Sequence, residues 1–309
     1  MDRFDEMQTF VRVVECNGIS AAAERLGMAK SAISRRLQGL ENRLAVQLLQ
    51  RTTRRISLTE DGRHFYARCL RILDELEEAE RSLSSEQQQV HGLLRVAAPL
   101  SFTLRHLAPL INEFLHRYPE VRLELDVEDR QINLLEEGVD LAIRIGKLDD
   151  SSLVARRLAP VRTVLCASPD YLAQRGEPQQ PADLQHHLGL SYANMSDQRQ
   201  WTLFDSKGAI HMARPRMRLR ANNGDLLLES LLAGLGIAVM PTFICHRELT
   251  DGRLRQLLPD YHSEPSAAYA IYPSRRHLPL RVRVFIDFLI ERLGDPPPWE
   301  TALPGLGGR

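Results

Sequence analysis

Three short helical patterns fill the first 44 residues, and their order limits the fold more than any other feature of the sequence. Hydrophobic residues at helical spacing predict helices over residues 4–16, 21–26 and 30–44. Asn17-Gly18 and Gly27 follow the first two patterns, and these residues tolerate the left-handed backbone that ends a helix. Ser20 is placed to cap the second helix. The segment therefore predicts a helix-turn-helix whose third helix carries an exposed polar face.

Basic charge is concentrated over this segment, although the whole chain is balanced, with 40 basic and 40 acidic residues. Between residues 28 and 58 there is one acid, Glu41, against seven basic residues: Lys30, Arg35, Arg36, Arg43, Arg51, Arg54 and Arg55. Residues 48–58 are expected to form two short strands around a turn at 51–55, a basic hairpin or wing. A local basic surface of this kind favours nucleic-acid binding.

The third helix and the wing have different expected roles at DNA. The second helix of a helix-turn-helix places its N-terminal part in the major groove, where lysine, arginine and serine can contact base edges. Arg36 and Arg43 suit phosphates, and the wing suits the backbone or the minor groove. The alternative is a solvated basic face without a ligand. The predicted DNA contacts are Lys30, Ser31, Ser34, Arg35, Arg36, Gln38, Arg43, Arg51, Thr52, Thr53, Arg54 and Arg55.

A long helix is predicted to follow the wing, over residues 60–90. Thr59 is its expected N-cap, and Glu60 and Asp61 favour the positive end of its dipole. Its apolar residues have the heptad spacing of a helix that pairs with another helix. They form the predicted dimer interface: Phe65, Cys69, Ile72, Leu76, Ala79 and Leu83. Cys69 then faces its own copy, as an interchain disulfide or as a small buried apolar side chain.

From residue 91 the pattern changes to alternating strands and helices. Runs over 93–145 predict βαβαβ and so a parallel sheet, and a second region of the same kind follows. The elements expected after residue 145 are strands over 161–167, 236–240 and 268–272, and helices over 225–233 and 280–293. Residues 295–309, with three consecutive prolines, are expected to be a disordered tail. The predicted fold class is α/β behind a helical N-terminal domain.

The N-terminal motifs resemble those of the LysR-type transcriptional regulators. The resemblance lies in AAAERLG, SAISRRLQGLE and RTTRRISLTEDG, and it continues less specifically through VLCASPDYL and LLAGLGIAVMP. It implies a winged helix-turn-helix DNA-binding domain at 1–59, a linker (dimerisation) helix at 60–90, and an effector-binding domain of two periplasmic-binding-protein-like α/β lobes at 91–294. It also implies a homodimer or homotetramer that binds double-stranded promoter DNA and changes DNA contact or bending when an effector binds. RNA polymerase as a partner, and activation against repression, stay open.

Two residues depart from the family pattern. Ala29 stands at the N-cap of the third helix, where the family often has serine or threonine, and loss of such a cap costs about 1 kcal/mol. Ala45 stands after that helix, where the family favours glycine, so the turn there is expected to have a different shape. Neither departure changes the predicted DNA binding.

The effector site is expected where strands of the α/β lobes end. Ligands of such folds lie outside the carboxyl ends of the strands, and helix N-termini there suit anions. The predicted effector contacts are Ser101, Phe102, Thr103, Arg130, Arg144, Gly146, Asn222 and Asn223, and they favour a small anionic or polar molecule. In the alternative interpretation, Ser101 only caps a helix and Arg144 only pairs with a carboxylate.

Other function classes find little support in the sequence. The motifs GxSxG, GxxxxGK[ST], GxGxxG after a strand and HExxH are absent, so no catalytic residue and no cofactor is predicted. The four cysteines have no metal-ligand spacing, so no metal is expected. No leader or membrane segment is recognised, which argues against a periplasmic solute receptor and a membrane partner and makes the cytoplasm the expected location.

Overall fold

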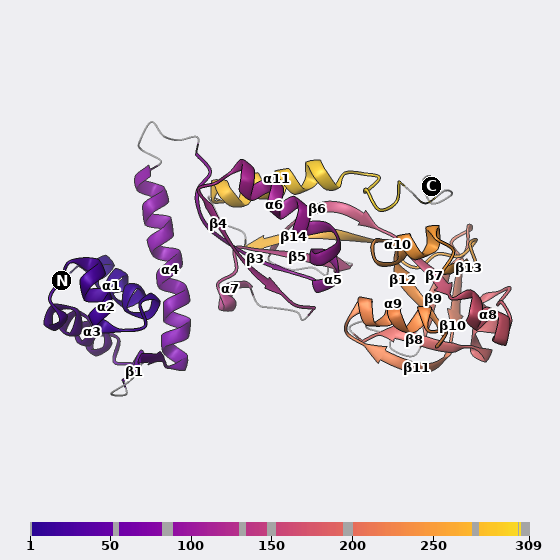
Figure 1. The fold of residues 1–309 in the computed structure, drawn as a ribbon, viewed down its shortest axis with the longest axis horizontal. Helices are drawn as coiled ribbons and strands as arrows, with labels where there is room; N and C mark the ends of the chain where they lie inside the picture. Colours follow the sequence, from indigo (N-terminus) through magenta and orange to yellow (C-terminus); the bar gives the residue numbers. More distant parts are fainter. Residues whose placement is uncertain are drawn as a thin grey trace. The chain divides into compact units, whose positions relative to one another are not determined.

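The computed structural model describes residues 2–51, 56–81, 89–129, 134–146, 153–193, 200–273, 278–301 and 303 (Figure 1). The chain forms two compact units. The first consists of residues up to Leu93 together with 132–139, and the second of residues 94–131 together with the chain from Asp140 onward. The predicted domain boundary at residue 90 lies near the end of the first unit's main segment.

The first unit contains the predicted helix-turn-helix and the two wing strands. Asn17 and Gly27 take the left-handed backbone expected between helices, with φ of 51° and 64°. The prediction for Ser20 is wrong, because the second helix begins two residues earlier, at Ile19, with Gly18 as its N-cap. Wing residues 52–55 lie outside the described residues. The elements are α1 (Arg3–Glu15), α2 (Ile19–Leu26), α3 (Lys30–Leu44), β1 (Leu49–Arg51), β2 (Ile56–Leu58) and α4 (Glu60–Arg81).

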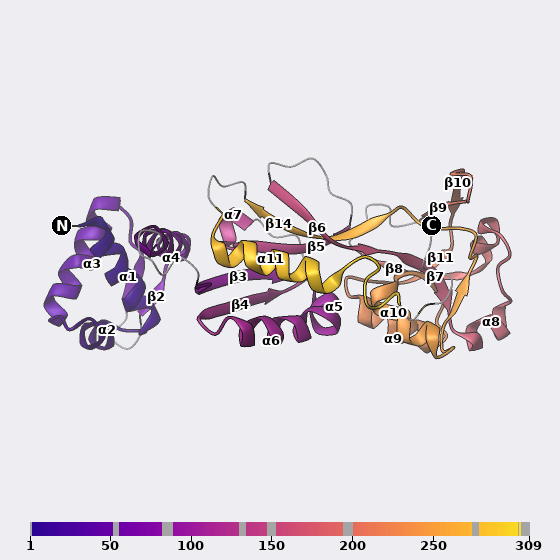
Figure 2. The same cartoon turned by 90° about the horizontal axis from the view of Figure 1, so that it is seen from above.

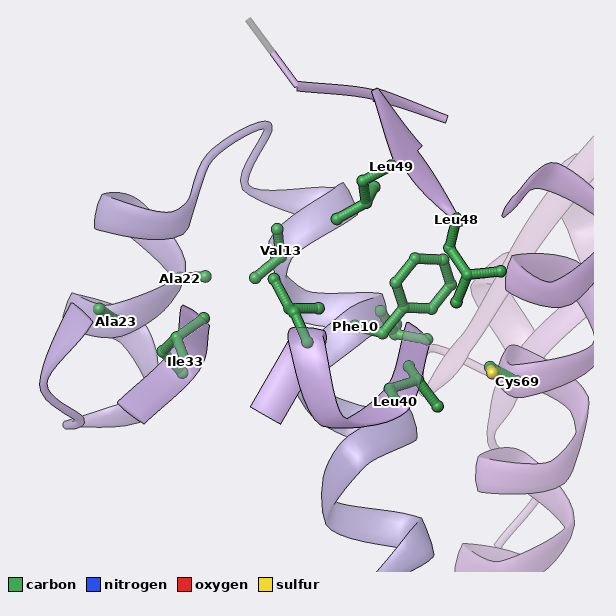
Figure 3. Packing of buried hydrophobic residues seen from close by; sticks show 11 residues of the cluster. Phe10, Val13, Ala22, Ala23, Ile33, Leu40, Leu48, Leu49 and Cys69 are labelled. Carbon is green, nitrogen blue, oxygen red and sulfur yellow. The ribbon is translucent and has the colours of Figure 1, made fainter. Parts of the chain in front are cut away.

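One apolar core joins α1, α2, α3, β1 and the start of α4 (Figure 3). Phe10 is fully buried in it, and its ring centroid lies 5.6 Å from that of Phe65 on α4. Thr59 begins α4 as predicted, because its Oγ1 accepts a hydrogen bond from the Gly62 amide at 2.9 Å. The same hydroxyl donates to the carbonyl oxygen of Gln47 at 2.7 Å. The wing and the long helix are thus anchored to the core at one residue.

The predicted dimer seam of α4 is divided between this core and the surface. Cys69 is 0% exposed in the core of its own unit, where Figure 3 shows it beside Phe10 and Leu40, and Phe65 packs against the same core. The expectation that Cys69 faces a second copy is therefore wrong, because α4 buries this side chain in its own unit, whereas Phe65 is half-buried and its place in the interface stays a prediction. Burial raises the pKa of the Cys69 thiol to about 12, so the buried apolar interpretation holds.

The second unit contains two lobes, each built on a five-stranded sheet. The first lobe has the strand order β4-β3-β5-β14-β6, and α11 runs along this sheet (Figure 2). Its strands are β3 (Gly92–Ala98), β4 (Val121–Val127), β5 (Leu141–Gly146), β6 (Leu153–Val161) and β14 (Ser266–Pro273). Its helices are α5 (Leu100–Phe102), the π-helix η1 (Thr103–Leu107), α6 (Ala108–Arg117) and α11 (Leu280–Leu293). The short helix α7 (Leu134–Glu137), between β4 and β5 in the chain, belongs to the first unit.

The second lobe has the strand order β11-β8-β12-β7-β13, with a separate β9–β10 hairpin. Its strands are β7 (Thr163–Ala167), β8 (Leu188–Tyr192), β9 (Trp201–Phe204), β10 (Ile210–Ala213), β11 (Arg216–Ala221), β12 (Ile237–Pro241) and β13 (Arg255–Leu257). Its helices are α8 (Pro169–Arg175), the 3₁₀-helix η2 (Pro181–His186), α9 (Gly224–Leu232) and α10 (Thr242–Thr250).

The expected parallel pairing is confirmed between β3 and β5, but both sheets as a whole are mixed. β3 and β5 pair parallel, but β14 pairs antiparallel with both β5 and β6. In the second lobe, β12 pairs parallel with β8 and antiparallel with β7. The cause is that the chain crosses between lobes at Arg162 and returns with β14, which enters the first sheet from the opposite end. The predicted strand 161–167 is therefore split, with Val161 ending β6 and Thr163 beginning β7.

The segment after α11 is folded as far as Leu303, which corrects the predicted disordered tail. Trp299 is 2% exposed, and its ring packs against Phe102 of the first lobe and Phe243 of the second. The Glu300 carboxylate accepts a hydrogen bond from the Thr242 hydroxyl at 3.1 Å. α11 ends before the prolines, with Gly294 as its C-cap, and the buried Trp299 anchors the segment that follows them. Residues 302 and 304–309 lie outside the described part of the chain.

Candidate functional site

The exposed face of α3 has the position and charge of a reading surface. Lys30, Ser31, Arg35 and Gln38 are exposed on it, and Ser34 is half-buried beside them. With 3.6 residues per turn, all five lie on one side of the helix. Neither Lys30 nor Arg35 makes a hydrogen bond or ion pair with any residue that the structure describes. Both cations are therefore directed to solvent.

Arg36 and Arg43 lie on the opposite side of α3 and are paired with α1. The Arg43 guanidinium donates to Glu6 Oε2 through Nε at 3.1 Å and through Nη2 at 2.7 Å. Arg36 donates to the Thr9 hydroxyl at 3.3 Å and to the Asp5 carboxylate at 3.4 Å. Their expected role at phosphates stays a prediction, although each arginine already has acceptors inside its own unit.

Both ends of α3 differ from the usual helix ends. Ala29 has the extended backbone of an N-cap, with φ −68° and ψ 140°, but its side chain provides no acceptor for the first free amides. Ala45 has φ 53°, a left-handed conformation that a Cβ disfavours. We expected the turn at Ala45 to differ in shape from a glycine turn. This expectation is wrong, because Ala45 adopts the left-handed backbone that glycine favours.

Glu41 is a positioning residue that sequence reasoning did not assign. Its Oε1 accepts hydrogen bonds from the backbone amides of Leu48 and Leu49, at 2.9 Å and 3.1 Å. The carboxylate thus fixes the start of β1 relative to α3, and with it the wing. One feature of the sequence could have identified it: Glu41 is the one acidic residue in the basic stretch between residues 28 and 58. Arg51 ends β1, and its side chain lies outside the described part.

A second group of polar side chains meets at the junction of the two lobes. Ser101 of α5 donates its hydroxyl to Asp225 Oδ2 of α9 at 2.5 Å. Arg105 of η1 donates to Asp225 Oδ1 through Nε at 2.9 Å and through Nη2 at 2.7 Å. Ser101 was predicted, whereas Arg105 and Asp225 were not. Arg105 was detectable, because it lies four residues after Ser101 and so on the same helix face.

Phe102 and Thr103 do not share that face, and their predicted effector contacts stay predictions. Phe102 is fully buried, with ring centroids 5.2 Å from Phe243 and 5.6 Å from His106. Thr103 is 5% exposed, and its hydroxyl lacks a hydrogen-bond partner among the described residues. Consecutive residues of a helix point in different directions, so Ser101 reaches the polar side of the junction while Phe102 packs on its apolar side.

His106 stabilises the aromatic side of this junction as a neutral ring. Burial lowers its pKa to about 4. Its Nε2–H donates to the Phe243 carbonyl oxygen at 2.8 Å, and its ring centroid lies 4.5 Å from that of Trp299. The two lobes therefore meet through a polar contact at Asp225 and an apolar contact around Phe102.

Of the remaining predicted effector residues, Asn223 lies at this junction. Asn223 is the N-cap of α9, and its Oδ1 accepts from the Leu226 amide at 3.0 Å. The Asn223 side chain is also hydrogen-bonded to Asp129. Burial raises the pKa of the Asp129 carboxyl above its usual range. Arg144 and Gly146 lie in β5, Asn222 is exposed, and Arg130 lies outside the described residues. Asp129 and Asp225 make the junction more acidic than the sequence suggested.

Other kinds of site were also considered in the described part of the chain. A pocket in the second lobe is lined by residues that the sequence did not single out: Thr163, Leu165, Leu203, Val239, Leu258, Tyr261, His262 and Ser263. No group of three or more histidine, cysteine or acidic residues there is arranged to hold a metal ion. Among the same residues, no helix combines the length and hydropathy needed to cross a bilayer.

Comparisons with known proteins match both units. Residues 4–63 match the family described as "Bacterial regulatory helix-turn-helix protein, lysR family", and residues 87–294 match "LysR substrate binding domain". The chain is 40% identical over 292 residues to the transcriptional regulator CrgA of Neisseria meningitidis serogroup C, covering 94% of this chain and 97% of that protein. It is 38% identical over 293 residues to the transcriptional regulator PtxR of Pseudomonas aeruginosa, covering 95% and 94%.

Solved structures agree with these sequence matches. The structure of CrgA from Neisseria meningitidis has a TM-score of 0.59 at 39% identity, covering 94% of this chain and 98% of that one. The full-length Vibrio cholerae virulence activator AphB has a TM-score of 0.58 at 32% identity, covering 94% and 99%. These relatives are regulators of transcription rather than enzymes.

Proposed function

This chain belongs to the LysR family of DNA-binding transcriptional regulators with an effector-binding domain, and on that basis we propose how it acts. It binds promoter DNA as a dimer or tetramer in the bacterial cytoplasm. A small anionic or polar effector binds the second unit and changes how the protein contacts or bends DNA. RNA polymerase is included as a partner on the family resemblance alone.

The observation that carries the DNA-reading proposal is the exposed face of α3. Lys30 and Arg35 are exposed and have no partner among the described residues. Unpaired cations at the start of a recognition helix suit guanine edges in the major groove. Arg36 and Arg43 are left out of the proposed contacts because α1 already holds them. Wing residues Arg51 to Arg55 stay in the proposal as contacts to the backbone or minor groove.

The proposed dimer contact is the outer face of α4. Ile72 is 38% exposed and Leu76 is half-buried, so this side of the helix leaves apolar surface for a second copy. The seam continues in the sequence through Ala79, whose side chain is not described, and Leu83, which lies outside the described residues. Sedimentation of wild type and Ile72→Asp measures this contact, and an unchanged oligomeric state in the variant contradicts it.

Genome-wide mapping of bound DNA tests the regulator function, followed by affinity measurements on the strongest site. Arg35→Ala should weaken specific binding by about 1–3 kcal/mol and relax sequence preference, because a base contact is lost. Arg36→Ala is the matched control: it removes the same charge from the opposite face and should leave affinity and the salt slope unchanged. Binding should weaken steeply with salt, by about −0.9 in log K per log salt for each neutralised phosphate. Absence of reproducible sites, or equal effects of the two variants, contradicts the proposal.

A further inference from the structure

The segment after α11 connects the first lobe to the second. α11 ends at Leu293 in the first lobe, and residues 295–301 continue from it. Trp299 and Glu300 of this segment are only 2% and 3% exposed. Glutamate is rarely buried in a protein unless other groups hold its carboxylate. The contacts of these two side chains therefore show what fixes the segment.

Glu300 is held where the chain crosses between the lobes. Its Oε2 lies 3.3 Å from Nε of Arg162, the residue between β6 and β7. Its Oε1 accepts a hydrogen bond from the hydroxyl of Thr242, the first residue of α10, at 3.1 Å. The Thr242 backbone amide in turn donates to the Arg162 carbonyl oxygen at 2.8 Å. One carboxylate thus joins the C-terminal segment, the crossing and the second lobe.

Trp299 joins the same segment to rings of both lobes. Its ring centroid lies 5.7 Å from that of Phe102 and 4.5 Å from that of His106, both in the first lobe. It lies 6.2 Å from the ring centroid of Phe243 in the second lobe. Packing among these buried rings stabilises the segment in its place. The segment is therefore a further, non-covalent link between the lobes, beside the chain crossings at Arg162 and before β14.

Two polar groups of the segment oppose this arrangement. The Trp299 Nε1–H group is buried and has no hydrogen-bond partner among the residues that the structure describes. Burial raises the pKa of the Glu300 carboxyl, because loss of water disfavours its charged form. Both groups regain water if the segment leaves its place. The held and released segments therefore differ less in free energy than apolar packing alone would give.

We propose that residues 295–301 form a strap that locks the two lobes in their present arrangement, with Glu300 as its latch. While the latch is closed, α11, the crossing at Arg162 and the start of α10 move as one body. When the contacts of Glu300 break, the strap is released and the lobes rotate about the chain crossings. This inference goes beyond DNA and effector binding, because the lock acts within the second unit and needs neither ligand.

The distance between spin labels on the two lobes tests the strap in the full-length protein. Asn112→Cys on α6 and Ala173→Cys on α8 replace exposed residues, and Cys16→Ser removes the one cysteine that is not buried. Labelled chains are diluted with unlabelled protein, so that each measured pair belongs to one chain. Without a change in the strap, the distance should form one narrow population. Glu300→Ala should raise the fraction of a second, open population about tenfold.

Glu300→Gln and Asp287→Ala are the matched controls. Glu300→Gln keeps an acceptor for the Thr242 hydroxyl but removes the charge beside Arg162, so its open fraction should lie between those of the wild type and Glu300→Ala. Asp287→Ala removes a carboxylate that pairs with Arg156 at 2.7 Å within the first lobe, so it should leave the distance unchanged.

The same measurement can overturn the strap. One narrow population in folded Glu300→Ala protein refutes the latch, and so does equal broadening in Asp287→Ala. If circular dichroism shows that Glu300→Ala is unfolded, Thr242→Val decides instead. It removes the hydroxyl that bonds Glu300 while keeping the shape of the side chain, so it should also populate the open state. An unchanged distance in Thr242→Val then refutes the proposal.

Discussion

The reading face of α3 and the lobe junction hold their arginines in opposite ways. Arg35 is exposed and has no partner among the described residues, whereas Arg105 gives two hydrogen bonds to Asp225. A solvent-exposed cation is hydrated and needs no partner in the protein. A partly buried cation loses hydration and requires an acceptor or counter-charge. DNA is a permanent polyanion that meets an exposed surface. At the lobe junction, the Asp225 carboxylate supplies the counter-charge for Arg105.

The two regions also differ in how the chain assembles them. The reading face comes from one helix, Lys30–Leu44, and so from neighbouring residues. The junction brings together α5, η1, α9, α10 and the segment after α11, which are far apart in the sequence. Its apolar side joins Phe102, Phe243 and Trp299. A change in the junction should therefore affect the whole second unit, whereas changes in α3 should stay local.

Trp299→Ala is expected to have the largest effect on stability. Trp299 is 2% exposed and contacts rings from both lobes, so truncation leaves a large cavity and should cost about 3–5 kcal/mol. Urea unfolding of the second unit measures this loss through Trp201, the other tryptophan of the chain. Trp299→Phe keeps a ring in place and should lose clearly less. A loss below about 1 kcal/mol for Trp299→Ala means that the C-terminal segment does not anchor the junction.

Arg43→Ala should destabilise the first unit by about 2 kcal/mol and leave specific DNA affinity nearly unchanged. Its removal leaves Glu6, a side chain only 7% exposed, without its two charged hydrogen bonds. Helical ellipticity during urea unfolding reports the loss, while tryptophan fluorescence should not change, because both tryptophans lie in the second unit.

Glu6→Gln/Arg43→Ala is the control for that prediction. Replacing the buried carboxylate with a neutral amide should recover part of the loss, because the uncompensated charge is removed. A loss of DNA affinity in Arg43→Ala as large as that in Arg35→Ala contradicts the separation of the two faces of α3.

Local features explain why much of the first unit could be predicted from sequence. Hydrophobic spacing, helix-ending residues and the cap at Thr59 all act within a few residues, and they placed α3 and the start of α4 correctly. The same spacing could also have separated Arg36 and Arg43 from the exposed face of α3, since a helix puts them opposite Lys30 and Arg35. The environment of Cys69 was harder to predict, because a heptad pattern does not distinguish pairing with a second copy from packing on α1.

Long-range contacts explain what the sequence could not show in the second unit. Ser101 was found because it follows a strand, but no local pattern connects it with Asp225, 124 positions later. The direction of β14 depends on the return of the chain from the second lobe, which alternation of strands and helices does not encode. Three prolines suggested disorder before Trp299, although a single buried aromatic side chain is enough to fix the segment.

Ala29→Ser should stabilise α3 by about 1 kcal/mol, because a hydroxyl can accept a hydrogen bond from a free amide of the first turn. The backbone at residue 29 already has the extended conformation of an N-cap. The gain should appear in urea unfolding followed by helical ellipticity. Ala29→Val provides no acceptor and should give no gain. Equal stability of the Ser and Val variants contradicts the missing cap as the cause.

Ala45→Gly is expected to give the smallest effect, a gain of about 0.5–1 kcal/mol in the first unit. Relief of the left-handed strain at φ 53° favours the variant, while the larger entropy of glycine in the unfolded chain opposes it. Ala21→Gly, within α2, is the matched control: the same substitution in ordinary helical backbone should cost about 1 kcal/mol. Urea unfolding should therefore show that the free energy of unfolding rises in Ala45→Gly and falls in Ala21→Gly. A loss at both positions means that Ala45 carries no relievable strain, and the turn after α3 is then more stable with alanine than with glycine.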